Sequence, residues 1–235
     1  MTILALETAT VVCGAALLDD AAVVAEAHLR RPRVHSARLT PLVEDVLAHA
    51  ERAPDALDAV AVSMGPGSYT GLRIGVSTAK GWARATEAVL IGVPTLEAYA
   101  AQLRPVTRPG DVACALLDAR RDEVYAGAFR RVDDGMEPHA ETTALPVDAL
   151  PDWLGPVEGR LWALGDGAEK SRSALEATAS TLTVLPPDEV APSAARVGRR
   201  GRARLDRRGP DDLSSLEPLY VKDVHATPAP SPFAH

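Results

Sequence analysis

The feature of this sequence that most constrains its fold is a pattern that occurs twice. The segments LALETATVVCGAALLDD (4–20) and ALLDARRDEVYAGAFRRVDD (115–134) each begin with an apolar run that ends in an acidic residue. A short polar turn and a second run of small and apolar residues follow, a pattern typical of two antiparallel strands. Because further strand and helix patterns come after each copy, the repetition predicts a duplicated α/β fold.

The remaining elements are predicted from the spacing of apolar residues. Short apolar runs predict strands at 2–6, 11–18, 21–29, 59–63, 89–93 and 161–164. Helical spacing predicts helices at 40–50, 69–84, 95–103, 168–177 and 193–205. Ser36 and Thr40 compete as the start of the first helix, since the hydroxyl of either residue can cap a helix N-terminus.

The chain is expected to divide at a linker. The segment RPVTRPGD (104–111) carries two prolines and a glycine, which break any periodicity. We therefore predict an N-terminal unit at 1–104 and a C-terminal unit at 105–224. The proline-rich end at 225–235 is expected to be disordered and has no readable function.

Composition indicates a cytoplasmic protein. The net charge of −7 argues against a surface coated for nucleic acid. No apolar run approaches the roughly 20 residues of a membrane span. The first residues, MTILALETAT, lack the basic region of a signal peptide. Cys13 and Cys114 lie far apart in apolar runs and are expected to be buried, reduced thiols.

The segment VSMGPGSYTGLRIGVSTAKGWA (62–83) resembles a phosphate-binding loop only in part. A strand, a glycine-rich turn and a helix follow one another, as such loops require. The spacing nevertheless fits neither the Walker motif nor the dinucleotide-binding motif, because Thr70 stands where the latter needs glycine. Ser68 also lacks the spacing of a nucleophile elbow.

The same segment carries small residues every four positions, at Gly67, Gly71, Gly75, Ala79 and Ala83. On a helix they form one smooth stripe. A glycine inside a helix costs about 0.8–1.0 kcal/mol relative to alanine, so this stripe needs a reason. A closely packed neighbour supplies one, because a missing Cβ lets another backbone approach. That neighbour is either the protein's own sheet or a second helix from the same or another chain.

Five stretches of the sequence resemble the bacterial TsaB (YeaZ) family. They are ALETAT, HSARLTPLVEDVL, GPGSYTGLRIGVSTAKGWA, LLDARRDEVYAGAF and EPLYVKDV, and they occur in the family's order over nearly the whole chain. The resemblance implies the actin-like ATPase (ASKHA) fold, with two duplicated ribonuclease-H-like domains. It also implies a place in the synthesis of threonylcarbamoyladenosine in tRNA.

The resemblance further implies the role of a non-catalytic partner. TsaB proteins bind the catalytic paralogue TsaD, which transfers a threonylcarbamoyl group to the adenosine beside the tRNA anticodon. TsaE supplies ATPase activity in the larger complex, and a second TsaB copy can take the place of TsaD in a homodimer. We expect contact with tRNA mainly through the complex, and no cofactor on this chain.

In the family, two helices of the first half form the partner interface. The corresponding helices here are the two most apolar ones of the N-terminal unit. We therefore expect the interface at Leu39, Leu42, Val43, Val46, Leu72, Gly75, Val76 and Ala79. A bulky residue at Gly75 is expected to abolish partner binding and to leave the monomer folded.

Metal and nucleotide sites are not expected. In catalytic relatives two histidines four residues apart on a helix share a metal ion. The matching positions here are Thr95 and Tyr99, and His35 is interpreted as a capping or surface residue. The turns that hold phosphate in ATPases of this fold contain no glycine at 7–10 or 118–123. Glu7 and Asp118, which could in principle hold a hydrated Mg²⁺, are interpreted as carboxylates that cap their turns.

Three further interpretations stay open. The arginine-rich stretch between Arg196 and Arg208 either contacts tRNA phosphates or is a solvated helix. The chain as a whole could be an active actin-fold ATPase or kinase, or a metallopeptidase, although it lacks the loops and ligand pair that these activities need. It could also be a homodimeric scaffold unrelated to tRNA.

Overall fold

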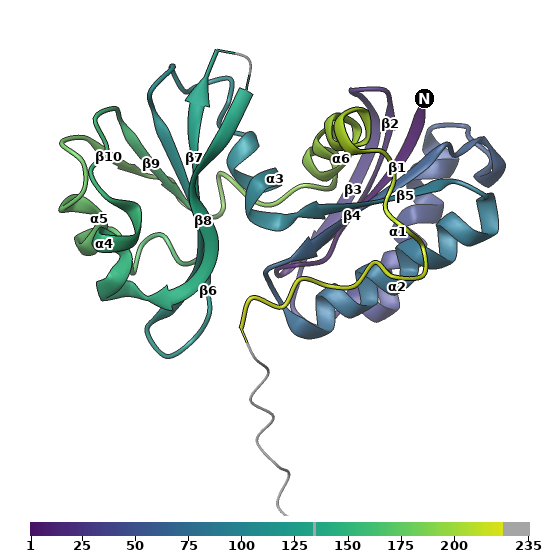
Figure 1. Cartoon of the computed structure of the whole chain (residues 1–235). Coiled ribbons are helices and arrows are strands. Elements are labelled where there is room, and N and C mark those ends of the chain that lie inside the picture. Colours follow the sequence, from purple (N-terminus) through teal and green to yellow (C-terminus); the bar gives the residue numbers. More distant parts are fainter. Residues whose placement is uncertain (134, 223–235) are drawn as a thin grey trace, which may run out of the picture.

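The computed structural model describes residues 1–133 and 135–222, which form two α/β units side by side (Figure 1). The predicted tail at 225–235 lies outside the described residues. In Figure 1 the first unit lies on the right and the second on the left.

The first unit is built on a mixed five-stranded sheet. Its strands are β1 (Thr2–Glu7), β2 (Val12–Asp19), β3 (Ala22–Arg30), β4 (Ala59–Gly65) and β5 (Val89–Pro94). Their order is β3-β2-β1-β4-β5. The first three strands are antiparallel, and β4 and β5 run parallel to β1.

The second sheet repeats the first. Its strands are β6 (Val112–Asp118), β7 (Glu123–Val132), β8 (Gly135–Pro146), β9 (Leu161–Leu164) and β10 (Leu182–Val184). Their order, β10-β9-β6-β7-β8, has the same antiparallel meander and the same two parallel strands. The duplicated topology predicted from the repeated pattern is confirmed.

Helices cover both faces of the first sheet. The helices are α1 (His35–His49), α2 (Tyr69–Thr86), α3 (Thr95–Ala101), α4 (Leu150–Leu154), α5 (Arg172–Glu176) and α6 (Ala194–Arg208), with short 3₁₀ turns at Pro54–Ala56 and Val147–Ala149. Helices α1 and α2 pack on one face, where Leu4, Leu6 and Val60 belong to their core. Helix α6 packs on the other face, against Ile3, Ala5 and Ala61.

Helix α6 returns to the first unit after the chain has built the second. It contacts all five strands of the first sheet and α3, and Gly198 and Gly201 bring its backbone close to Ala5 and Ala61. A division of the chain at 104/105 assigns this helix to the C-terminal unit by position in the sequence. In space it completes the N-terminal one (Figure 1).

Helix α3 joins the two units. Leu96, Tyr99 and Ala100 share an apolar cluster with Phe129 and Leu164 of the second unit. The hydroxyl of Tyr99 donates a hydrogen bond to the carbonyl oxygen of Val190, in the segment that leads back to α6. One end of the boundary between the units is therefore a packed, apolar joint.

Cys13 and Cys114 are buried, free thiols, as the sequence predicts. Among the described residues, no helix has the length and the apolar character that crossing a lipid bilayer requires.

Candidate functional site: the cleft between the units

A cleft of about 810 Å³ lies between the two units. On the first unit it is lined by the β1–β2 turn, the β3–α1 loop and the first turn of α2. The β6–β7 turn and Asp166 line it on the second unit, and Lys222 comes from the C-terminal segment. Segments that lie more than 200 residues apart thus meet at this site.

On the first side, the carboxyl group of Glu7 ends β1 in a buried position. Its side chain is 1% exposed, and its Oε1 accepts a hydrogen bond of 2.7 Å from the backbone N–H of Ala9. Burial raises the pKa of Glu7 from 4.5 to about 7, and hydrogen bonds from Ala9 and Ser63 oppose that rise. The interpretation of Glu7 as a turn-capping carboxylate is confirmed.

Three backbone amides of this first turn, those of Thr8, Ala9 and Val12, are already bonded within the chain. The N–H of Thr8 donates to the hydroxyl of Ser63 at 3.3 Å. The N–H of Val12 donates to the Thr10 hydroxyl at 3.2 Å, and Ala9 is held by Glu7. A phosphate group approaching the turn would have to displace these partners.

On the second side, Asp118 ends β6 and organises the β6–β7 turn. Its carboxylate is paired with Lys170, whose hydrogen bond holds the pKa of Asp118 below its usual value. The N–H of Arg120 donates to the same carboxylate at 3.2 Å. Arg120, Arg121 and Asp122 all have left-handed backbone conformations, with φ of 66°, 50° and 59°. Asp118 therefore also caps its turn, as predicted.

Asp166 is, with Asp118, one of the two carboxyl groups that line the cleft, whereas Glu7 is buried behind it. Burial raises its pKa, and its Oδ1 accepts a 2.8 Å hydrogen bond from the N–H of Asp118. Within residues 1–133 and 135–222, no three His, Cys, Asp or Glu side chains are grouped closely enough to hold a metal ion.

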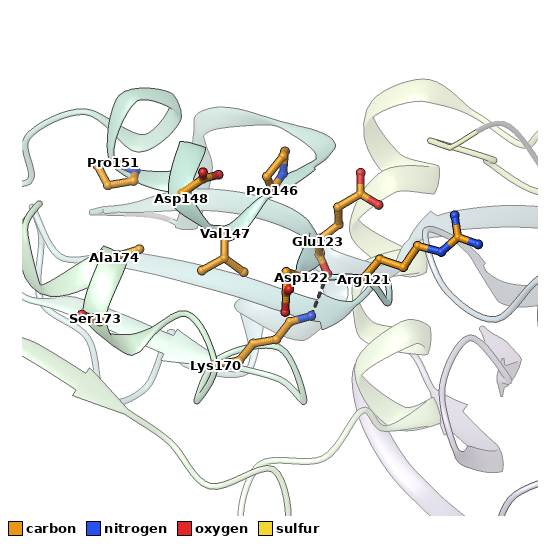
Figure 2. Close-up of a pocket in the computed structure, with 10 residues that line it drawn as sticks. All are labelled: Arg121, Asp122, Glu123, Pro146, Val147, Asp148, Pro151, Lys170, Ser173 and Ala174. Carbon is orange, nitrogen blue, oxygen red and sulfur yellow. Dashed lines mark hydrogen bonds between the residues drawn. The ribbon is translucent and has the colours of Figure 1, made fainter.

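A second hollow, of about 870 Å³, lies behind the β6–β7 turn (Figure 2). Its wall includes Lys170, whose ammonium group donates a 2.8 Å hydrogen bond to the carbonyl oxygen of Glu123. Figure 2 shows the carboxylate of Glu123 pointing away from Lys170. Lys170 thus holds both ends of the turn, at Asp118 and at Glu123.

The two positions that match the metal-binding histidines of catalytic relatives have structural roles here. The hydroxyl of Thr95 accepts a 3.0 Å hydrogen bond from the N–H of Gly65. Tyr99 is 3% exposed and belongs to the joint between the units.

His35 differs from its prediction as a capping or surface residue. It is 8% exposed, and its Nε2 lies 3.1 Å from the carbonyl oxygen of Val12 in β2. The helix begins at His35 with no side-chain cap, so neither Ser36 nor Thr40 starts it. This contact joins the start of α1 to β2.

The stripe of small residues on α2 faces the protein's own β1–β2 turn. A Cβ atom at Gly67 would overlap the backbone of Ala9, and one at Gly71 would overlap the carbonyl oxygen of Thr8. A Cβ at Gly75 would overlap the Thr8 hydroxyl. Of the two interpretations of the stripe, the intramolecular one is correct, and Gly75 is unsuited to test partner binding because a bulky side chain there disrupts the monomer.

The eight residues expected at a partner interface face the interior of this chain. Their side chains are between 0 and 7% exposed where a side chain is present, and Gly75 is buried. These residues are Leu39, Leu42, Val43, Val46, Leu72, Gly75, Val76 and Ala79. They hold α1 and α2 against the sheet, so a partner that approaches this helix pair meets its opposite, exposed side instead.

Four of the seven arginines of α6 have partners inside the chain, and one of them, Arg199, donates to the carbonyl oxygen of Ala21. Arg200 and Arg204 form ion pairs with Glu97 of α3, and Arg202 pairs with Asp206 and Asp20. The interpretation as a solvated helix is only partly right, because one side of α6 packs on the first sheet. Contact between this helix and tRNA stays a prediction.

The fold and cleft define a two-unit α/β protein with the actin-like ATPase architecture. A family model for TsaD, the tRNA N6-adenosine threonylcarbamoyltransferase, matches residues 30–171. The TsaB protein of Escherichia coli is 38% identical over 171 residues, which are 71% of this chain and 72% of that protein. This chain belongs to the TsaB (YeaZ) family of tRNA threonylcarbamoyladenosine biosynthesis proteins, and the predicted family is confirmed.

Two other relatives agree with this assignment. The TsaB protein of Bacillus subtilis is 38% identical over 130 residues, so the match spans 55% of this chain and 56% of that protein. A Pseudomonas aeruginosa protein with similarity to peptidase YeaZ superposes with a TM-score of 0.80 at 26% identity. That superposition covers 94% of this chain and 99% of the other. The predicted fold is therefore confirmed over nearly the whole length.

Proposed function

We propose that this chain is a non-catalytic partner that binds and activates the TsaD threonylcarbamoyltransferase, which forms N6-threonylcarbamoyladenosine beside the anticodon of tRNA. It acts in the cytoplasm, forms a heterodimer with TsaD, joins TsaE in a larger complex and reaches tRNA mainly through that complex. A second copy of the chain occupies the same helix pair when TsaD is absent.

The observation that carries the proposal is the state of the two cleft turns. The amides of Thr8, Ala9 and Arg120 donate to acceptors of the same chain, so they are not free to surround a phosphate. A turn that binds nucleotide needs free amides and room for close approach. The cleft is therefore better suited to hold the two units in position than to bind ATP.

The exposed side of α2 supports a partner at the helix pair. Gly81 lies in the middle of this helix, is exposed, and has no atom within 4 Å of the position of its absent Cβ. Exposed Ser77 and Ala85 lie one turn before and after it. A glycine at this position destabilises the helix by about 0.8–1.0 kcal/mol relative to alanine, and no contact inside this chain requires it. Close approach by a partner helix would explain why a glycine stands there.

Gly81→Trp is the substitution that tests this face. The side chain has room in the monomer, so the thermal midpoint is expected to stay close to that of the wild type. Because the indole blocks a close helix contact, the affinity for TsaD measured by calorimetry is expected to fall at least tenfold, about 1.4 kcal/mol. Arg207→Trp is the matched control, since exposed Arg207 lies on α6 at the opposite face of the same sheet. Equal affinity for both variants would place the interface elsewhere.

Reconstitution tests the role itself. Threonylcarbamoyladenosine formed by purified TsaD and TsaE is expected to rise when this chain is added. The alternative, an active ATPase or metallopeptidase, predicts that the isolated chain binds Mg-ATP or Zn²⁺ in calorimetry. Turnover of ATP by the chain alone would contradict the proposed role.

A further inference from the structure

The segment after α6 runs back along the first unit and is bonded to it at several points. The N–H of Asp211 donates to the carbonyl oxygen of Leu90 at 2.9 Å, and its carboxylate accepts from Gly92 at 2.7 Å. Further along, the ammonium group of Lys80 donates to the carbonyl oxygen of Ser214 at 3.1 Å. In Figure 1 this segment is the yellow coil that runs alongside α2.

Residues 216–220 fix the segment beside the first turn of α2. Leu216 is 8% exposed and packs into the core beneath α1 and α2. The N–H of Leu219 donates a 2.6 Å hydrogen bond to the carbonyl oxygen of Met64. The ring of Tyr220 lies 5.1 Å from that of Tyr69, centroid to centroid. The segment is therefore anchored on the first unit up to the edge of the cleft.

Two residues further, the chain contacts the other unit. Lys222 lines the cleft and forms an ion pair with Glu123, the first residue of β7. Lys170 uses only the carbonyl oxygen of Glu123, so the carboxylate remains available to Lys222. This pair therefore connects a segment anchored on the first unit to the turn of the second.

We propose that residues 216–222, the C-terminal latch, hold the cleft in its closed arrangement. Helix α3 is the hinge at one end of the boundary between the units. At the cleft, the ion pair between Lys222 and Glu123 is a reversible contact between them. Both side chains of the pair are a little more than a quarter exposed, at 28% and 29%. An ion pair this exposed changes a closed-to-open ratio by up to about fivefold, so the latch is reversible.

Charge reversal tests the latch in the full chain. Dyes on cysteines placed at exposed Ser77 and Asp152 report the distance between the units, and the native thiols are buried. Lys222→Glu and Glu123→Lys are each expected to shift the distance distribution towards a longer, broader form. The double reversal restores the pair with exchanged charges and is expected to return the distribution to that of the wild type.

Two results would overturn the proposal. One is a wild-type distribution in both single variants, and the other is a double variant that stays open. Each variant is first checked for an unchanged thermal midpoint. Lys222→Gln provides a second test, because it removes the positive charge of the pair without adding a negative one. The partially opened distribution expected for Lys222→Gln distinguishes loss of attraction from repulsion between like charges.

Discussion

Replacing Gly71 by alanine is expected to destabilise the protein by about 3 kcal/mol. The added methyl group overlaps the backbone carbonyl oxygen of Thr8, a fully buried residue, so the helix and the turn would have to move apart. The same replacement at Gly81, ten residues further along α2, is expected to stabilise the protein by about 0.8–1.0 kcal/mol, because alanine favours the helix and meets no neighbour.

Urea unfolding of the two variants measures the difference directly. The change in the free energy of unfolding is expected to have opposite signs at the two positions. This result would separate the effect of packing from that of helix propensity, because propensity alone predicts a gain in stability at both. If Gly71→Ala were as stable as the wild type, the close approach of α2 to the β1–β2 turn would be wrong.

The second large effect is a dependence of stability on pH that comes from Glu7. In the folded protein its pKa is about 7, whereas the ordinary value of 4.5 holds in the unfolded chain. Between these values the folded state keeps a proton that the unfolded state has lost. The contribution of the protonated Glu7 to the free energy of unfolding is therefore fully present below pH 4.5. It is lost as the pH rises to about 7, and the loss is about 3 kcal/mol in total.

Glu7→Gln is expected to remove this slope, because glutamine stays neutral and its oxygen still accepts the hydrogen bond from Ala9. The variant should match the wild type near pH 4.5 and exceed its free energy of unfolding at pH 8. Glu44→Gln, at an exposed position of α1, is the matched control and should keep the slope. Retention of the full slope in Glu7→Gln would assign the dependence to another group.

The sequence predicts most of the fold because strands with a buried face carry strong apolar patterns. Strand β8 was not predicted, and its composition explains why. It lies at the edge of its sheet, contains Pro138 and is half-exposed, so it lacks a continuous apolar run. Strand β10 has only three residues, too few for any periodicity.

The site is harder to predict than the fold for two physical reasons. The spacing of Leu39, Leu42 and Val43 identifies the apolar side of a helix, and that spacing is the same whether the side packs on the protein's own sheet or on a partner. The sequence signal for the proposed partner face is Gly81, a helix glycine that becomes informative only once the structure shows that nothing lies beside it. The latch joins Lys222 to Glu123, and no local pattern connects residues so far apart.

The return of α6 to the first sheet has a consequence for how the protein is made. During translation, the strands of the first unit emerge between about 100 and almost 200 residues before the helix that covers Ile3, Ala5 and Ala61. That apolar sheet face stays bare until the second unit has been synthesised, and a nascent or truncated chain ending near 104 exposes it to aggregation. Completion of the N-terminal unit is thus one of the last events in the biogenesis of the molecule.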